Sequence, residues 1–572
     1  MPFDFIQKFP EIHPVLLQLL YNRDLTSQKA IDEFLNPDWG EDVHDPFLFR
    51  DMGKAVDRIG RAIKDKDLIV VYGDYDADGV TGSVILKTTL EALCAKVDVY
   101  LPHREKEGYG LSDPALIFLK EKGAKLVLTC DCGVSNLLEI DKALKAGIEV
   151  IITDHHRVPK ELPEAYAIIH PLLPDEQYPC KYLTGGAVAF KLAQGLLRAP
   201  WANECFTAKG GPPVGFEKWL LDLVALSLVA DVGKLIGENR TLLKYGLIVL
   251  NKTRRPGLRK LCEVSSIKIG SLTASNIAWQ ITPRINAAGR MDHANAAFAL
   301  LTEQDPEKAQ AMALNLNQAN TERQKITEAI IKEANVLIEA GGEKPIYLLY
   351  KEGWNPGVIG LSASRLIEKY GRPVILATNN HKGEIVASSR SIDQFNIVEA
   401  FEVCQEFLIR FGGHPRAAGF TIKQEQWEPF KQRMESLAQL ALTKEELTPQ
   451  LNLDLELNLD EVNWDLWRDL ELLAPYGAGN PEPRFLLKNL EVHETCVCGN
   501  NGQHLRLMVL SPKGVLKKLI GFSFADTDRH ETNWCKTLVK GTRLDAAVEV
   551  GVNEWNGNSE LQLKVVDLRL AF

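Results

Sequence analysis

The sequence lacks the cysteine pattern of a structural zinc site. Its ten cysteines form no Cys-x-x-Cys pair. Cys130 with Cys132 and Cys496 with Cys498 are single Cys-x-Cys pairs, and neither has the matching second half that such a site needs. The plain interpretation of Cys130 and Cys132 is that they are small buried residues on either side of Asp131.

Long apolar runs are absent as well. No stretch reaches the roughly 18–20 apolar residues that a membrane-spanning helix requires, and the first residues do not resemble a secretory signal peptide. We therefore expect a cytoplasmic protein with reduced thiols and no membrane partner.

Positive charge is not in excess. The chain has 66 Lys and Arg against 76 Asp and Glu, a net charge of −10. This balance weighs mildly against nucleic-acid binding, which usually needs a basic face, but carboxylates that bind cations would hide several negative charges. With 45% hydrophobic and 25% charged residues over 572 positions, the chain is typical of a globular protein with three or four domains.

Acidic and imidazole side chains recur through the first half of the chain. They are Asp74, Asp76 and Asp78 in the run Asp74–Gly79, then Asp131, the run Asp154-His155-His156, and Asp231. Carboxylates repel one another, so a fold that gathers this many gathers them around cations. Oxygen ligands with one or two imidazoles suit Mg²⁺ or Mn²⁺, and a pair of such ions is suited to cleaving phosphate esters.

The spacing of apolar residues predicts how these side chains meet. Short apolar runs predict strands at Leu68–Tyr72, Val97–Leu101, Lys125–Cys130 and Glu149–Thr153, with amphipathic helices at Thr81–Leu93, Pro114–Lys122 and Leu137–Ala146. This alternation is typical of an open parallel sheet. Asp74, Asp131 and Asp154 each follow the end of a strand, so we expect them to converge on one crevice at the carboxyl edge of the sheet.

The remaining patterns predict the domain organisation. We expect helices at Gly186–Leu197 and Glu217–Val229, a long helix from Pro306 to about Ile338, and period-two strands with polar turns after Leu451. The predicted fold class is α/β: a parallel-sheet domain and a second α/β lobe joined by a long helix, followed by an OB-type β-barrel. The expected boundaries are a helical segment at 1–50, a catalytic domain at 51–300, a connecting helix at 301–344, a second lobe at 345–445 and the barrel at 446–572.

Other interpretations of the acidic run are weaker. Asp74-x-Asp76-x-Asp78-Gly79 matches the first half of a calcium-binding EF-hand loop. The twelfth position is Ile85 rather than Glu, and the run follows a strand instead of a helix, so this alternative fails. A solvated acidic turn would explain one such run, but not its occurrence with the other sites.

Together these motifs carry a family resemblance. Asp74–Gly79, Asp131, Asp154-His155-His156 and Asp231 resemble the four motifs of the DHH phosphoesterase family. Gly412–Gly419 resembles the Gly-Gly-His phrase of the family's associated second domain, and the likeness continues through Pro283–Arg290 and Leu473–Pro483. It covers the chain from about Asp51 onward and is greatest to the branch of bacterial single-strand-specific 5′→3′ DNA exonucleases.

The resemblance implies a two-metal centre. Its ligands to Mn²⁺ or Mg²⁺ would be Asp76, Asp78, Asp131, His155 and Asp231, with Asp131 or Asp231 bridging the two ions. Asp74 ranks lower, because Tyr72 stands where some family members have a His ligand, and Asp74 could either replace it or support its neighbours. Asp131, His155 and His156 would be catalytic, with His156 meeting the substrate phosphate.

The resemblance also implies a site for a DNA end. Arg104, Arg290, Ser388 and Arg390 would hold a terminal 5′-phosphate, Tyr109 would stack on the terminal base, and His414 would contact the DNA backbone, with Arg284 and Asn286 as further DNA-binding positions. Taken singly, Arg390 is a surface arginine and Tyr109 a packing residue. Phe522, Phe524 and Trp555 of the barrel are candidate stacking platforms, and barrel core is at least as good an explanation of each.

The implied activity is degradation of single-stranded DNA from the 5′ end to mononucleotides, in DNA recombination and repair. Single-strand-binding protein and a helicase are the expected partners, and the expected state is a monomer. Two alternatives remain open. A phosphodiesterase for short oligoribonucleotides or cyclic dinucleotides would not need the barrel, and a non-catalytic DNA-binding scaffold would not need every metal-ligand position filled.

Overall fold

The computed structural model describes residues 1–203, 215–380, 382–443, 447, 450–526, 532–555 and 557–571. The chain forms two compact units. Unit 1 combines Met1–Asp42, Lys234–Arg240 and Gln450–Phe572, and unit 2 contains Val43–Gly233 and Thr241–Pro449. Segments far apart in the sequence therefore share unit 1.

The first lobe of unit 2 is built on a parallel sheet. Its strands are β1 (Leu68–Gly73), β2 (Lys96–Tyr100), β3 (Leu126–Cys130), β4 (Glu149–Thr153) and β5 (Ala167–Ile169), in the order β2-β1-β3-β4-β5. Four of these strands lie within one residue of their predicted bounds. Three of them, β1, β3 and β4, are continuous apolar runs buried in the sheet, whereas β2 at its edge is half-buried. The fifth, β5, was not predicted.

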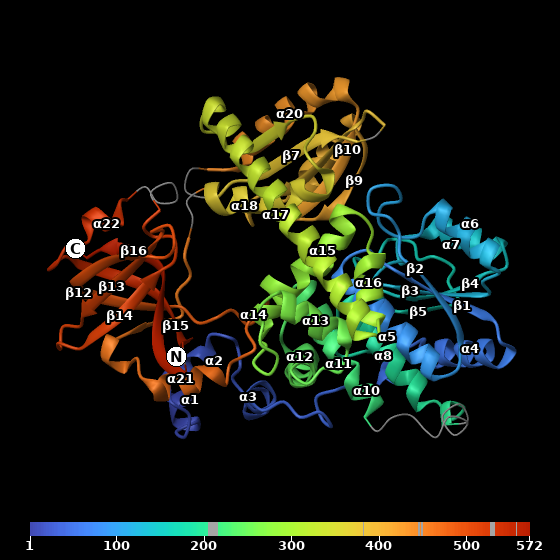
Figure 1. Cartoon of the computed structure of the whole chain (residues 1–572), viewed down its shortest axis with the longest axis horizontal. Coiled ribbons are helices and arrows are strands. Elements are labelled where there is room, and N and C mark those ends of the chain that lie inside the picture. The colour runs from blue at the N-terminus through green and yellow to red at the C-terminus, as the bar shows by residue number, and fades with distance from the viewer. Residues whose placement is uncertain are drawn as a thin grey trace. The chain divides into compact units, whose positions relative to one another are not determined.

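Helices cover both faces of this sheet (Figure 1). One face carries α6 (Asp113–Lys122) and α7 (Leu137–Lys145), which bury Ala115, Leu119, Ile140 and Ala143 with strand residues. The other carries α4 (Met52–Asp65), α5 (Ala77–Ala92) and α8 (Gly185–Arg198). The lobe continues with η1 (Pro46–Leu48), α10 (Phe216–Trp219), α11 (Leu221–Ala230), α12 (Gly237–Leu250), α13 (Pro256–Val264), α14 (Ala274–Asn276), the π-helix η2 (Ile277–Ile281), α15 (Thr282–Met291) and α16 (Asn295–Thr302).

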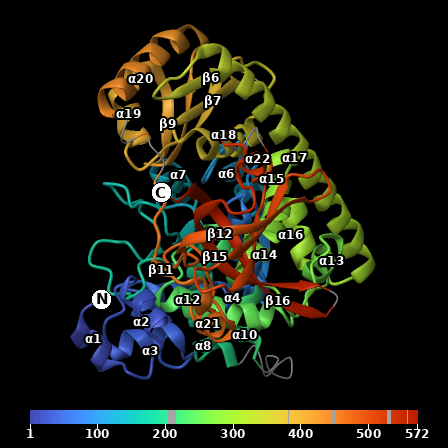
Figure 2. The same ribbon diagram turned by 90° about the vertical axis from the view of Figure 1, so that its left-hand side faces the viewer.

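The second lobe of unit 2 follows the long helix α17 (Pro306–Gly341). Its strands are β6 (Tyr347–Tyr350), β7 (Val374–Asn379), β8 (Ile385–Arg390), β9 (Leu408–His414) and β10 (Ala417–Ile422), in the order β6-β7-β8-β10-β9. Only β6 and β7 pair in parallel within it. One face of this sheet packs on α17 and α18 (Pro356–Tyr370), and the other face packs on α19 (Ile397–Val403) and α20 (Trp427–Ala441) (Figure 2). Two short 3₁₀ turns, η3 (Gln405–Phe407) and η4 (Gln424–Gln426), precede β9 and α20.

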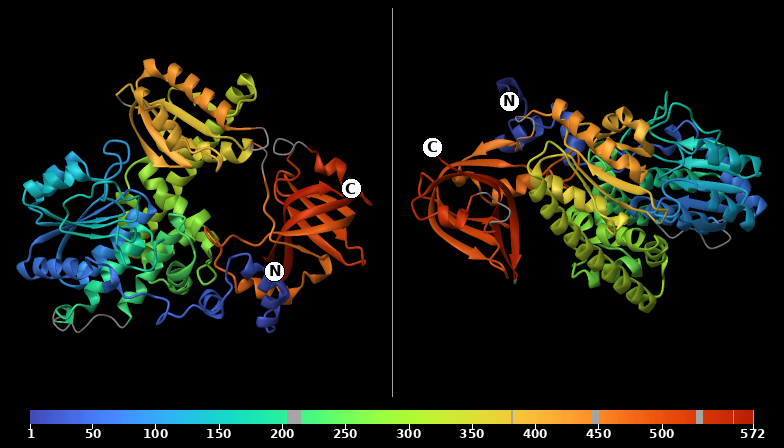
Figure 3. Two further views of the ribbon diagram at one scale, coloured as in Figure 1. Left: turned by 180° about the vertical axis from the view of Figure 1, so that it is seen from behind. Right: turned by 90° about the horizontal axis from the view of Figure 1, so that it is seen from above.

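Unit 1 contains a closed antiparallel-rich barrel. Strands β12 (Phe485–Cys498), β13 (His504–Leu510), β14 (Leu516–Gly521), β16 (Asn558–Leu570) and β15 (Arg543–Trp555) pair in that order, and β15 returns to pair with β12 (Figure 3). β11 (Leu455–Leu457), η5 (Leu459–Glu461), α21 (Trp464–Glu471) and α22 (Trp534–Thr537) complete this part. Helices α1 (Phe3–Lys8), α2 (Pro14–Tyr21) and α3 (Gln28–Leu35) bury Phe5, Leu17 and Phe34 in the same core as the barrel strands.

The structure confirms the predicted fold class and corrects details of it. The alternating leucines from Leu451 to Leu459 form only the three-residue strand β11 and part of a 3₁₀ turn. The helix predicted at Glu217–Val229 is two helices, α10 and α11, and the 14-residue strand β12 was not predicted. Among the described residues, no helix is both long and apolar enough to cross a membrane.

One arginine holds three segments of unit 1 together. The guanidinium of Arg240 is buried and donates hydrogen bonds to the carbonyls of Phe34 (2.7 Å), Leu472 (3.2 Å), Ala474 (2.8 Å) and Pro475 (3.4 Å). It also lies 3.8 Å from the centre of the Phe34 ring. The segment Lys234–Arg240 is thereby fastened to the N-terminal helices and to the run that leads into the barrel.

We predict that Arg240→Ala lowers the free energy of unfolding of unit 1 by roughly 3 kcal/mol, because buried carbonyls lose their donors. Scanning calorimetry of the full chain would measure the shift. Arg468→Ala is the matched control: Arg468 is an exposed arginine of α21 in the same unit, and its loss should cost at most about 0.5 kcal/mol. Equal effects of the two variants would show that Arg240 does not hold these segments.

Candidate metal centre and anion-binding cleft

The loop between β1 and α5 is shaped by its own acidic residues. Asp76 caps α5, and its Oδ1 accepts hydrogen bonds from the backbone N–H groups of Asp78 (2.9 Å) and Gly79 (3.1 Å). A Cβ on Gly79 would lie 2.6 Å from the backbone nitrogen of Asp74, so only glycine fits this close approach. Asn286 fixes the loop from α15, because its Oδ1 accepts a hydrogen bond from the N–H of Ala77 at 2.8 Å.

Asp78 is held by groups that the sequence analysis did not single out. Its Oδ1 accepts from the N–H of Gly186 (2.8 Å) and the hydroxyl of Ser227 (2.6 Å), and its Oδ2 accepts from the N–H of Gly185 (2.8 Å). A Cβ on Gly185 would lie 2.5 Å from Asp131, which explains why a Gly-Gly pair opens α8. That glycine pair was the available sequence signal.

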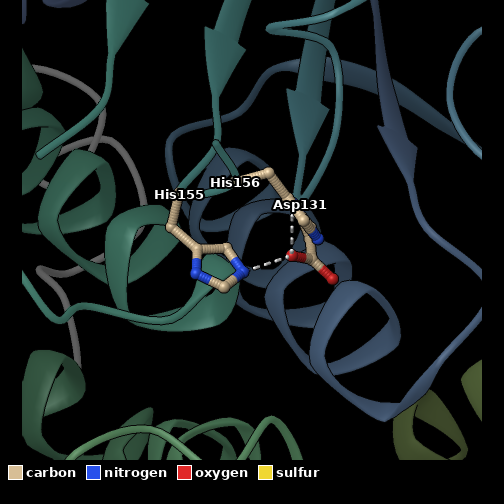
Figure 4. Close-up of side chains that lie close together, drawn as sticks. All are labelled: Asp131, His155 and His156. Atoms are coloured by element: carbon tan, nitrogen blue, oxygen red, sulfur yellow. Dashed lines mark hydrogen bonds and ion pairs between the residues drawn. The ribbon is translucent and has the colours of Figure 1, made fainter. Parts of the chain in front are cut away.

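The structure brings the predicted metal-binding side chains together. Ligand atoms lie within 4.8 Å of one another in three groups: Asp131, His155 and His156; Asp78, His155 and Asp231; and Asp74, Asp76 and Asp131. Nε2 of His155 is 3.1 Å from Asp131 Oδ1 (Figure 4). The same nitrogen is 3.5 Å from Asp231 Oδ2 and 3.8 Å from Asp78 Oδ2. Asp131 and His155 therefore belong to two groups each and connect all three.

The cluster concentrates negative charge away from water. Burial, with repulsion from Asp76, raises the pKa of Asp78 to about 7, and burial with repulsion from Asp78 raises the pKa of Asp231 to about 8. The pKa values of Asp74 and Asp131 are raised for the same two reasons. Burial lowers the pKa of His155 to about 3, so this imidazole is neutral and has a lone pair for a metal.

The donor set fits a hard divalent cation. Oδ1 of Asp74 is buried and has no hydrogen-bond partner in the described part of the chain. Such an orphaned carboxylate oxygen is costly without a cation. Five aspartates and one neutral imidazole are ligands that suit Mg²⁺ or Mn²⁺. Tyr72, at the position that is His in some DHH proteins, donates its hydroxyl to the carbonyl of Gly110 instead.

The second histidine of the tripeptide has a different environment. His156 Nδ1 is 2.8 Å from Asp154 Oδ1 and 3.8 Å from Asp131 Oδ1. Burial alone would lower the pKa of His156, but the hydrogen bond to Asp154 raises it to about 9. His156 is thus an imidazolium beside the carboxylate cluster, and Tyr109 Oη lies 2.9 Å from its Nδ1. The ring of His414, from the second lobe, stacks 6.5 Å away.

Next to the carboxylates lies a cluster of arginines. Burial and repulsion from Arg104 lower the pKa of Arg390, and burial with repulsion from Arg104 and Arg390 lowers the pKa of Arg290 to about 9. Nη1 of Arg390 lies 3.4 Å from Oγ of Ser388, and Arg290 donates to the carbonyl of Gly357 at 3.1 Å. Three guanidinium groups that repel one another favour the presence of an anion near them.

Other predicted positions lie elsewhere. Arg284 donates to Asn317 Oδ1 (2.9 Å) and to the carbonyl of Gln280 (2.6 Å), hydrogen bonds that involve neither the carboxylates nor the three arginines. In the barrel, Phe522 is 47% exposed, whereas Phe524 is buried in the core, as the plainer interpretation had it. The side chain of Trp555 lies outside the described residues.

Known proteins share this arrangement. Family models match the chain at residues 68–228 (DHH family, N-terminal domain), 342–440 (DHHA1 domain) and 453–567 (RecJ OB domain). The single-stranded-DNA-specific exonuclease RecJ of Bacillus subtilis is 36% identical over 97% of this chain and 68% of its own length. The protein of that name from Haemophilus influenzae is 33% identical over 97% and 96%.

Solved structures agree with the sequence matches. The crystal structure of RecJ in complex with Mn²⁺ from Thermus thermophilus superimposes with a TM-score of 0.79 at 31% identity, covering 99% of this chain and 77% of that one. A structure of exonuclease RecJ bound to manganese covers 68% of this chain and 95% of its own, with a TM-score of 0.58 and 35% identity. The resemblance to the DHH phosphoesterases is confirmed, and the chain belongs to the RecJ family within them.

Proposed function

We propose that this protein is a single-stranded-DNA-specific exonuclease that degrades its substrate from the 5′ end to mononucleotides, in DNA recombination and repair. The observation that carries the proposal is the cluster in which Asp131 and His155 connect three groups of metal-binding atoms beside His156, whose Nδ1 lies 2.8 Å from Asp154 Oδ1. The relatives named above, which bear the name of that activity, support it.

Asp74, Asp76, Asp78, Asp131, His155 and Asp231 would hold two Mn²⁺ or Mg²⁺ ions. Bound there, such a pair supplies Lewis-acid stabilisation of the negative charge that develops on the scissile phosphate. Asp131 and His155, each of which belongs to two of the three groups of ligand atoms, would be the central residues of the site that holds these ions. Asp78, with its hydrogen bonds to Gly185, Gly186 and Ser227, cannot rotate away from the cluster.

His156 would act directly on the substrate. As an imidazolium it can donate a proton or a hydrogen bond to the scissile phosphate or to the 3′-oxygen that leaves. Asp154 keeps the proton on Nδ1 and orients the ring, so that Nε2 is the atom free to donate. His414 would contact the DNA backbone from the second lobe, close to the same phosphate.

The arginine cluster would recognise the end of the strand. Arg104, Arg290 and Arg390 with Ser388 form the anion site that a terminal 5′-phosphate would occupy, and Tyr109, whose side chain is 42% exposed, would stack on the terminal base. Arg284 and Asn286 remain proposed DNA-side residues, with Asn286 acting through the loop that it fastens. The barrel would lengthen the grip on the strand.

The cellular setting follows from the substrate. We place the protein in the cytoplasm, working as a monomer with a single-strand-binding protein and a helicase that expose single-stranded DNA. Copurification and sedimentation of the full chain would test this setting.

Asp131→Ala should lower exonuclease activity by on the order of 10³-fold, because it removes the carboxylate shared by two groups of ligands. The assay is digestion of a 3′-labelled single-stranded oligonucleotide with Mn²⁺, where 5′→3′ action produces a ladder of shortening labelled fragments that EDTA abolishes. Asp98→Ala is the control, since Asp98 lies on β2 of the same sheet, outside the cluster, and pairs with Lys122 of α6. Immediate release of the labelled nucleotide, or no digestion by the wild type, would contradict the proposed polarity or activity.

Asp154→Asn should lower activity by about 10–100-fold, the cost of losing a residue that positions another. Without the carboxylate, the pKa of His156 falls from about 9 toward its ordinary value, so the deficit should be small near pH 6 and grow toward pH 8. The pH profile of kcat for the variant and the wild type measures this. A deficit that is the same at every pH would show that Asp154 does not act through the proton of His156.

Without metal, stability should decrease as the pH rises from 6 to 8. Asp78 and Asp231 have folded pKa values of about 7 and 8, above the ordinary 3.8, so in this range the folded state binds more protons than the unfolded state. Thermal unfolding in EDTA should show a drop on the order of 5 °C, and Mg²⁺ should abolish it. In the variant Asp231→Asn, the melting temperature in EDTA should fall less steeply with pH. A flat profile in EDTA would contradict the repulsion described above.

A further inference from the structure

A cavity of about 620 Å³ lies beside the proposed terminal-phosphate site. Both lobes of unit 2 line it: Arg104 and Lys106 from the loop after β2, Ser388 from β8, Lys382 from the turn between β7 and β8, and Arg410 from β9. Pockets of roughly 300–1,000 Å³ accommodate whole small molecules, so a single phosphate would occupy only one end of this cavity.

Strand register shows the direction in which the cavity extends. His414 of β9 lies in one row with Ala417 and Arg390, and Arg410 lies four residues along the same strand. At about 3.4 Å per residue, Arg410 is roughly 14 Å from the His414 row. Ser388 lies in the row between them. The cavity thus continues past the phosphate site and away from the metal centre.

Among the described residues that line the cavity, four cations outnumber three glutamates by one, so the lining favours an anion by a single net charge. In the described part of the chain, Arg104, Lys106, Lys382 and Arg410 form no ion pair with a carboxylate. Three glutamates also line the cavity, and two are engaged by other groups. Glu107 accepts hydrogen bonds from the hydroxyls of Tyr100 and Ser112, and Glu384 accepts one from the side chain of Asn380. Glu105, the third, is exposed on the loop that carries Lys106.

The first turn of α18 adds to this preference. Pro356 and Gly357 line the cavity at the start of this 15-residue helix, where the helix dipole favours negative charge. Pro356 has no N–H and the N–H of Gly357 donates to Asn355 Oδ1 at 2.8 Å, so the dipole rather than a free donor makes this contribution. The cavity therefore has anion-binding groups at its phosphate end and separate cations, Lys382 and Arg410, farther along.

We propose that this cavity receives a phosphate chain that extends from the 5′ end of the strand, so that the enzyme accepts 5′-triphosphate ends. The proposal rests on the proposed exonuclease function. Arg104 and Ser388 would hold the first phosphate, and Lys106, Lys382 and Arg410 would hold the outer ones.

The reaction is the same hydrolysis, with a different first product. Water adds to the phosphorus between the first and second nucleotides, and the bond from that phosphorus to the 3′-oxygen of the first nucleotide breaks. The 3′-oxygen takes a proton and leaves as a hydroxyl on a nucleoside 5′-triphosphate. The shortened strand keeps the phosphate as its new 5′-monophosphate, so later rounds release mononucleotides.

The test compares two single-stranded oligonucleotides that differ only in a 5′-monophosphate or a 5′-triphosphate, under single-turnover conditions with Mn²⁺. For the wild type we expect first-nucleotide release from the triphosphate end at a rate within about threefold of the monophosphate end. The double variant Lys382→Ala/Arg410→Ala should lose about tenfold or more on the triphosphate end, the effect of one or two charge-assisted contacts, and less than about twofold on the monophosphate end. Lys423→Ala, an exposed lysine after β10 that does not line the cavity, is the matched control.

The outcomes separate this proposal from the one on which it rests. No digestion of either oligonucleotide refutes the exonuclease function itself. If the wild type digests the monophosphate end but releases the first nucleotide from the triphosphate end at least about tenfold more slowly, only the extended cavity is refuted. The same conclusion follows if the double variant loses the same factor in rate on both ends. Free tripolyphosphate could inhibit the wild type but not the double variant, while the triphosphate end is cut slowly. That combination would assign the cavity to a free anion and overturn the proposal.

Discussion

Mutual repulsion of buried carboxylates is the constraint on which the rest of this structure depends. Asp74, Asp76, Asp78, Asp131 and Asp231 lie in groups whose ligand atoms are within 4.8 Å of one another, and the pKa of Asp78 is raised to about 7. Burial first, and repulsion from neighbouring carboxylates second, raise this pKa, and both favour an arrangement that disperses the charges unless cations are present. The fold resists dispersal through rigid elements: the carboxylates sit at the ends of strands and at the ends of helices, and backbone N–H groups hold the most buried of them.

Glycines make this crowding sterically possible. Gly79 lets the acidic loop fold back on itself, and Gly185 and Gly186 bring the start of α8 against Asp131 and Ser227. A methyl group at any of these positions would meet neighbouring backbone or side-chain atoms at less than 3 Å. The close approach of the backbone to the charged side chains therefore depends on glycines, which have no side chain to obstruct it.

The arginine cluster also brings like charges close together, in this case positive ones. Arg104, Arg290 and Arg390 are mutually repelling cations, and two of them come from the first lobe and one from the second. The carboxylate cluster and the arginine cluster both lie in unit 2, where Arg104 acts electrostatically on Asp74 and the rings of His156 and His414 lie 6.5 Å apart. Such a pairing suits a substrate whose phosphates must be held at one point and hydrolysed at the next. The cavity beyond Ser388 extends the anion-binding side.

The sequence by itself determined the parallel sheet and the convergence of its acidic residues. Apolar runs of strand length alternate with amphipathic helices, and the carboxyl ends of parallel strands meet at one edge, so Asp74, Asp131 and Asp154 had to meet. Sequence patterns predicted secondary structure less well where a strand needs a partner far away in the chain. The leucines after Leu451 alternate as in a strand, but only β11 forms, because only Leu455–Leu457 pair with β12.

Only the tertiary structure decided how the site divides its roles. His155 and His156 are adjacent and chemically identical in the sequence, but burial lowers the pKa of one to about 3 and Asp154 raises that of the other to about 9. The engagement of Asp78 by Ser227, the orphaned oxygen of Asp74 and the cavity beside Arg104 likewise involve residues far apart in the chain. Protonation and coordination depend on which groups are near in space, and that proximity is a property of the folded chain rather than of any segment of it.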